Sequence, residues 1–185
     1  MRKLVITFTM LFAVISLMAQ EHLSFKGIPI EGSMTAFCQK LKAKGFTSIG
    51  SENNLTLFTG RNATVGVTAT DDGKDVFAVV VLFDPSGEWN ALVNTYDYYK
   101  DLYTRKYGKP SISKEKNPAL SDSNTALMAE VHQGTVVYGS AWEVTGGDIQ
   151  LSIEKSSGVY KGMVMIRYRD SQNVEAKIQN DLNDI

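Results

Sequence analysis

The hydrophobic period along the chain changes between helical and strand-like spacing, and the changes mark the expected elements. The first helix is expected at residues 34–44, between a capping Ser33 and a terminating Gly45. Its apolar positions recur every three or four residues, at Met34, Phe37, Cys38 and Leu41. From residue 46 to 83 the period is two and turn sequences separate the runs, which predicts strands.

A strand and a long helix form the strongest pair of signals. Residues 76–83, VFAVVVLF, are apolar throughout, which predicts a strand buried on both faces or lying centrally in the sheet. We expect residues 84–86 to open a helix that ends before Gly108. One stripe of this helix should pack on the sheet, comprising Trp89, Leu92, Tyr96, Tyr99, Tyr103 and Tyr107. Tyr98 falls off the stripe, so we expect it to be exposed.

The second half repeats this alternation more weakly. Residues 111–125 are polar and contain Pro118, which predicts a connecting loop before strands resume. Two strands then place alternate apolar residues on one face, at Ile149, Leu151 and Ile153 and at Val164, Ile166 and Tyr168. A last helix should start at Asp170, with one apolar side made of Val174, Ile178, Leu182 and Ile185.

A weak internal repeat organises these elements into a fold. Residues 65–84 can be laid on residues 149–170, since each segment is a hairpin that runs into an Asp-capped helix. We therefore predict an α+β fold with an antiparallel sheet and helices packed on one face, built from two tandem helix-plus-four-strand units. The two units would be residues 33–83 and 84–185.

The first 19 residues predict export. Arg2 and Lys3 precede an apolar stretch at residues 4–18, and small Ala19 offers a cleavage point, which is the pattern of a secretory signal peptide. The alternative is a membrane anchor, but the 15 residues of this stretch fall short of the roughly 20 needed to span a bilayer. We expect residues 20–185 to form one secreted domain, periplasmic or extracellular, without a membrane span.

The amino-acid composition limits the classes of partner that we expect for the chain. Its 19 Lys and Arg nearly balance 20 Asp and Glu, giving a net charge of −1, and loss of Arg2 and Lys3 would make it only slightly more negative. Such a mild charge favours neither a nucleic acid nor an anionic membrane. Cys38 is the single cysteine, so no intramolecular disulfide can form.

Cysteine and histidine are the first residues to test for chemistry. Cys38 could be a nucleophile, but its place on the apolar side of the first helix favours an inert, buried thiol. His22 and His132 are the two histidines, which makes a histidine metal site improbable. We expect His132 near a strand end, as a surface or turn residue rather than a catalytic base.

Two short motifs fail on their context. Residues 71–75, DDGKD, resemble part of a calcium loop, yet Val76 stands where that loop needs glycine and Leu82 where it needs glutamate. A hairpin turn with Gly73 at positive φ explains the segment. Ser111 and Lys114 have the serine-x-x-lysine spacing of penicillin-binding enzymes, but no KTG follows.

Surface signals remain open to more than one interpretation. The tyrosine stripe could stack on sugars, although its helical spacing favours a role in the core. Asn54 and Asn62 lie in glycosylation sequons that matter only in a glycosylating host. The sequence thus assigns no catalytic, cofactor-binding or metal-ligating residue.

Five segments carry a family resemblance: FKGIPIEG, FCQKLKAKGF, LYTRKYGKP, GDIQLSIE and VMIRYRDSQN. Together they resemble a family of small secreted proteins from gut Bacteroidetes whose function is uncharacterised. The resemblance implies secretion and one compact α+β domain, and it brings no catalytic residues. The expected architecture also resembles that of secreted β-lactamase inhibitor proteins and small envelope-assembly modules, which is an analogy of fold alone.

These observations favour a non-enzymatic binding module for a protein or a glycan. The sheet face not covered by helices would be the platform, and Gln150, Ser152 and Glu154 would lie on it. Two alternatives stay open. One is a small envelope hydrolase whose carboxylates the fold brings together, and the other is a structural envelope protein.

Overall fold

The computed structural model describes residues 21–50, 53–115, 123–183 and 185. The predicted leader, residues 1–19, lies outside these ranges. The helices of the described residues are α1 (Met34–Ala43), α2 (Trp89–Tyr107), α3 (Asn124–Gln133) and α4 (Ser171–Asn183). A small hairpin is formed by β1 (Ser24–Phe25) and β2 (Ile28–Pro29). The strands of the large sheet are β3 (Thr47–Ser48), β4 (Asn53–Phe58), β5 (Arg61–Ala69), β6 (Val76–Phe83), β7 (Ile112–Glu115), β8 (Tyr138–Val144), β9 (Gly147–Lys155) and β10 (Gly162–Asp170).

The large sheet confirms the predicted α+β class. Its strand order is β3-β4-β5-β6-β10-β9-β8-β7, and every neighbouring pair is antiparallel. The first four strands follow α1 and the last four follow α2, with α3 inserted between β7 and β8. The two runs of four strands meet where β6 pairs with β10, with Val81 opposite Ile166.

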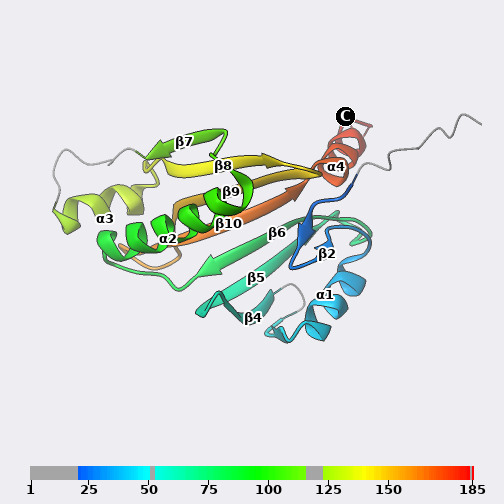
Figure 1. Cartoon of the computed structure of the whole chain (residues 1–185), viewed down its shortest axis with the longest axis horizontal. Coiled ribbons are helices and arrows are strands. Elements are labelled where there is room, and N and C mark those ends of the chain that lie inside the picture. Colours follow the sequence, from blue (N-terminus) through cyan, green and yellow to red (C-terminus); the bar gives the residue numbers. More distant parts are fainter. Residues whose placement is uncertain (1–20, 51–52, 116–122, 184) are drawn as a thin grey trace, which may run out of the picture.

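Helices α1, α2 and α3 pack on one face of the sheet, and Figure 1 shows α2 lying over β9 and β10. Strict alternation in β9 and β10 turns every second side chain toward these helices. The largest of the fully buried side chains come from both halves of the chain: Trp142, Tyr96, Tyr99, Phe25, Phe37, Ile30, Leu41, Ile149, Leu151, Ile153, Ile166 and Val65. One continuous core therefore spans the β6–β10 junction.

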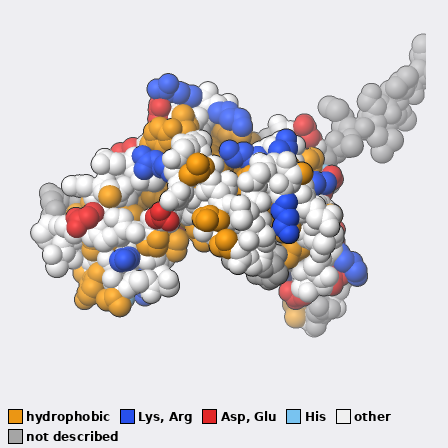
Figure 2. All heavy atoms as spheres, turned by 90° about the horizontal axis from the view of Figure 1, so that it is seen from below, with side chains coloured by type: hydrophobic (Ala, Val, Ile, Leu, Met, Phe, Trp, Pro, Cys, Tyr) orange, Lys and Arg blue, Asp and Glu red, His pale blue; other side chains and the backbone are white. Residues whose placement is uncertain are grey.

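The opposite face of the sheet carries the side chains that alternate with the core residues along each strand. In β10 these residues are Met163, Met165, Arg167 and Arg169, and each is half-buried. The side of the molecule turned away from α2 is the lower side of Figure 2, where the outline is hollowed between two lobes. We call this surface the open face.

Several sequence predictions are confirmed in detail. Ser33 caps α1 by accepting a hydrogen bond from the Ala36 amide at 3.3 Å. The aromatic stripe of α2 is buried except for Tyr107, which is half-buried, whereas Tyr98 is 42 % exposed. Gly73 has φ +69° in the turn between β5 and β6.

The loop predicted at residues 111–125 is wrong in part. Its start forms β7, a four-residue edge strand whose exposed polar residues look like a loop in sequence. Its end begins α3, which Ser123 caps and which buries Leu127, Met128 and Val131. His132 consequently lies in the last turn of α3 rather than near a strand end.

Two other helices also differ from the prediction. Helix α2 begins at Trp89, not at residues 84–86. Ser86 instead exchanges two backbone hydrogen bonds of 2.9 Å with Gly162 of β10, and this bridge holds the chain extended. Val174, Ile178 and Leu182 of the apolar side predicted for the last helix lie in α4 and Ile185 lies beyond its end, and none of the four is buried. Helix α4 lies against the ends of β6, β9 and β10.

No helix among the described residues is long and apolar enough to cross a membrane.

Substitution of two neighbouring residues in β10 tests which face holds the core. Ile166 is fully buried and points toward α2, so Ile166→Ala should lower the free energy of unfolding by about 2–5 kcal/mol. Met165→Ala, on the open face, should cost less than about 1.5 kcal/mol. Urea unfolding of both variants measures the difference, and equal losses would contradict a core on one face.

Candidate functional site

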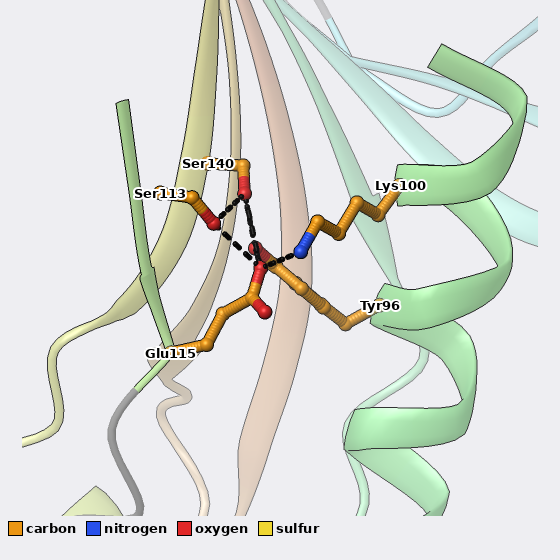
Figure 3. Close-up of polar contacts among 5 residues, drawn as sticks. All are labelled: Tyr96, Lys100, Ser113, Glu115 and Ser140. Carbon is orange, nitrogen blue, oxygen red and sulfur yellow. Dashed lines mark hydrogen bonds and ion pairs between the residues drawn. The ribbon is translucent and has the colours of Figure 1, made fainter. Parts of the chain in front are cut away.

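Three places in the fold gather side chains that could serve a function. The first is a polar cluster between α2 and β7, made of Tyr96, Lys100, Ser113, Glu115 and Ser140 (Figure 3). The second is a groove on the open face, and the third is a cleft lined by aromatic rings between the β1–β2 hairpin and α2. We call them the polar cluster, the sheet groove and the aromatic cleft.

The polar cluster converges on one carboxylate oxygen. Oε1 of Glu115 accepts hydrogen bonds from the hydroxyls of Tyr96 at 2.8 Å, Ser113 at 2.9 Å and Ser140 at 3.1 Å. Lys100 also donates to this oxygen and forms an ion pair with it. Tyr96 and Lys100 come from successive turns of α2, while the other three residues come from β7 and β8.

Burial and charge set the protonation of this cluster. Burial by itself raises the pKa of Glu115, but the hydrogen bonds from Lys100, Tyr96 and Ser113 and the charge of Lys100 outweigh it, so the net pKa falls below 4.5. Burial raises the pKa of Tyr96 above its usual range. Near neutral pH the cluster therefore holds a carboxylate, an ammonium and neutral hydroxyls.

The cluster is poorly suited to nucleophilic catalysis. A serine nucleophile needs a base that takes its proton, and a carboxylate of lowered pKa paired with Lys100 is a weak base. Ser140 is also only 4 % exposed, so a substrate has little access to it. The arrangement instead fixes β7, the edge strand of the sheet, against α2.

The sheet groove lies on the opposite side of the same strands and has a volume of about 250 Å³. Gly139 and Ala141 of β8 contribute little side-chain bulk to it. The predicted platform residues Gln150, Ser152 and Glu154 line the groove together, as predicted from their alternation. Ile112 of β7, 58 % exposed, adds an apolar wall.

The aromatic cleft has a volume of about 580 Å³ and is larger than the sheet groove. Rings from three parts of the chain line it, namely Phe58, Tyr99, Tyr103, Tyr107 and Tyr168. The sequence predicts the tyrosine stripe of α2, but the cleft arises only when β10 and the β1–β2 hairpin meet that helix. The turn of this hairpin places Lys26 at φ +53° and Gly27 at φ +74°.

The structure places Cys38 half-buried on α1, packed against the core. Burial raises the pKa of its thiol, and the opposing effects of Lys42 and a hydrogen bond from Asn54 are smaller. A thiol with a raised pKa is a weak nucleophile near neutral pH. The inert role stays a prediction.

The two histidines lie in different settings. Nδ1 of His22 is 3.1 Å from Oδ2 of the fully buried Asp170, and Nε2 is 3.7 Å from Glu31. The same Asp170 accepts hydrogen bonds from the amides of Leu23 and Asn173, so this contact joins the N-terminal segment to α4. The ring of His132 instead lies 4.9 Å from that of Tyr160.

Acidic residues gather around the turn between β5 and β6. Asp71, Asp72 and Asp75 face Asp181 of α4 across a hollow of about 240 Å³. Hydrogen bonds from Lys74 and Thr70 lower the pKa of Asp72 to about 2, so it cannot act as a general acid near neutral pH. Among the described residues no cluster of His, Cys, Asp and Glu could hold a metal ion.

The remaining residues singled out by sequence motifs lie on strands or directly beside them. Ser111 directly precedes β7 and its hydroxyl donates to the Ala141 carbonyl at 3.1 Å, while Lys114 is exposed on β7. Asn54 is 1 % exposed beneath α1, so the folded chain does not offer this sequon for glycosylation, whereas Asn62 is exposed. Sequence reasoning missed Glu115 because it placed this residue in a loop.

Neutralising Glu115 should weaken the fold and change its pH dependence. Glu115→Gln leaves Lys100 unpaired and should cost about 1–3 kcal/mol of unfolding free energy at pH 7. Because the folded-state pKa is lowered, the carboxylate's contribution is fully present above the unfolded-state pKa near 4.5 and is lost as the pH falls through the lower folded-state value. Urea unfolding between pH 3 and 7 should show the two proteins converging in acid.

The matched control for Glu115 is Asp101→Asn, which breaks an exposed pair with Arg105 on α2 and should cost at most about 0.5 kcal/mol. A loss for Glu115→Gln no larger than that of the control would contradict the role of the cluster.

The raised pKa of Cys38 predicts slow alkylation. Iodoacetamide at pH 7.5 should modify the folded protein at least about tenfold more slowly than free cysteine, because less thiolate is present and the side chain is half-buried. The rate should still be rising at pH 9. Mass spectrometry follows the reaction, and a rate equal to that of free cysteine would show a reactive thiol.

Comparison of the chain with protein-family models, with curated proteins and with solved structures gave no match. The resemblances suggested by the sequence therefore stay predictions, and the function rests on the geometry of the chain itself.

Proposed function

We propose that this protein is an exported binding module whose open face binds another protein. The observation that carries the proposal is a patch of half-buried aliphatic side chains on β6 and β10, flanked by polar side chains of β9 and β10, on the face opposite α1, α2 and α3. Export rests on the leader sequence at residues 1–19.

The strand register builds this surface from rows of adjacent residues. One row runs from Leu82 of β6 through Met165 of β10 to Ser152 of β9. The next row runs through Val80, Arg167 and Gln150 in the same order of strands. The rows continue into the sheet groove at Gly139 and Ala141. A partner seated on these rows would thus contact several strands at once.

Of the two arginines on this surface, Arg169 is paired with a carboxylate and Arg167 is available to a partner protein. Arg169 binds Asp148 with two hydrogen bonds of 3.2 and 3.1 Å, and Gln150 donates to the same carboxylate. Arg167, by contrast, contacts the sulfur of Met165 at 3.9 Å and has no carboxylate partner among the described residues. An arginine beside aliphatic side chains is typical of the residues that dominate protein interfaces.

The side chains of the two rows favour a protein over a glycan. They are aliphatic, amide, hydroxyl and guanidinium groups, with no aromatic ring on which a sugar could stack. Met, Val and Leu instead offer the apolar contact that protein interfaces desolvate at their centre. The hydrolase alternative would need a convergent acid and base, and the polar cluster offers a paired carboxylate instead.

A charge placed in the centre of the open face tests the proposal. Met165→Glu should abolish recovery of the partner by affinity capture from cell envelope and culture medium, because it replaces an apolar contact by a carboxylate and offers Arg167 an ion-pair partner within the chain. Val159→Glu makes the same change at an exposed apolar residue in the turn between β9 and β10, and should capture as well as the original protein. Near-ultraviolet circular dichroism checks that both variants fold.

Each outcome of the capture decides between the candidate functions. A protein recovered by the original chain and by Val159→Glu but lost with Met165→Glu supports the proposal. A partner retained by Met165→Glu places binding elsewhere, and an empty capture favours the structural alternative. Binding of the purified chain to a glycan array that Met165→Glu abolishes would replace the protein partner by a glycan.

A further inference from the structure

The aromatic cleft lies on the helix-covered side of the sheet, away from the open face, and it has its own chemistry. It opens between the β1–β2 hairpin, the turn after β4 and the second half of α2. Its volume of about 580 Å³ lies within the range of about 300–1,000 Å³ typical of small-molecule sites.

The floor of the cleft presents rings rather than free polar atoms. The hydroxyls of Tyr103 and Tyr168 hydrogen-bond each other. The hydroxyl of Tyr99 donates to the Phe58 carbonyl at 2.9 Å and contacts the Thr59 hydroxyl at 2.6 Å. Because these groups already have partners, the floor favours an apolar body over a sugar, which would need new hydrogen bonds there.

The mouth of the cleft, in contrast, is positively charged. Lys26 places its ammonium 4.5 Å from the centre of the Phe58 ring, and Lys106 lies 4.8 Å from that of Tyr107. Neither lysine forms an ion pair with a carboxylate of the described chain. Glu21 also lines the cleft, and His22 beside it faces Asp170 and Glu31.

Two unpaired ammonium groups above an apolar floor select for a particular kind of ligand. A neutral apolar molecule would leave both charges unused, and a small hydrophilic anion would leave the rings uncovered. A molecule with both parts can bury its apolar body against the rings while its anionic end meets the lysines. We propose that the aromatic cleft binds an amphiphilic carboxylate, an aliphatic or aromatic body that ends in one carboxylate group.

Decanoate is a suitable probe, and decanol has the same chain without the charge. Isothermal titration of the purified protein should detect decanoate binding below the concentration at which decanoate forms micelles. The double variant Lys26→Gln/Lys106→Gln should bind decanoate roughly tenfold more weakly, since two partly exposed ion pairs are lost. Its affinity for decanol should stay within about twofold of the original.

Two further variants separate the cleft from general surface effects. Leu102 lines the cleft, so Leu102→Trp should fill it and weaken decanoate and decanol together by about tenfold or more. Val144→Trp, at the end of β8, serves the same purpose if Leu102→Trp does not fold. Lys44→Gln/Lys161→Gln removes two exposed lysines that do not line the cleft and should leave binding unchanged.

Three results would overturn the proposal. They are an absence of decanoate binding to the original protein, unchanged decanoate affinity in Lys26→Gln/Lys106→Gln, and full affinity in a folded variant whose cleft is filled by tryptophan. Met165→Glu, which lies on the other face, should bind decanoate normally. The test therefore stands or falls separately from that of the open face.

Discussion

The antiparallel pairing of β6 with β10 is the interaction on which the rest of the structure depends. It joins two four-stranded runs, formed far apart in the chain, into one sheet with a single register. The pairing places Val79 and Val81 in the same buried layer as Ile166 and Tyr168. A shift by one residue would turn each of these side chains to the opposite face, so the core fixes the register as much as the hydrogen bonds do.

A core on one face leaves a surface free on the other. The three helices that close the core lie on the same side, and the alternation of β9 and β10 puts Gln150, Ser152, Met165 and Arg167 on the side they do not cover. Glu115 adds to this arrangement at the edge, because its hydrogen bonds hold β7 against α2 and so keep the wall of the sheet groove in place. Binding at the open face thus needs no change in the core.

The sequence predicts those parts of the fold that a local pattern specifies. The alternation at Ile149, Leu151 and Ile153 and the stripe from Trp89 to Tyr103 both identify buried faces correctly, because burial imposes the period of the element. Edge strand β7 has no buried residue to mark it, so it looks like a loop. The polar cluster and the aromatic cleft join residues that lie far apart in the chain, such as Tyr96 with Ser140 and Leu23 with Tyr168, and no spacing rule can reveal such pairs.

The central claim is that the open face is the binding surface of this protein, and methionine oxidation tests it most directly. Met163 and Met165 are half-buried on that face, whereas Met128 is 2 % exposed beneath α3 and Met34 lies at the start of α1. Hydrogen peroxide followed by mass spectrometry should oxidise Met163 and Met165 of the free protein well before Met128. Addition of a captured partner should then protect Met163 and Met165 but not Met34. Oxidation of Met163 and Met165 at the same rate with and without the partner would contradict the account.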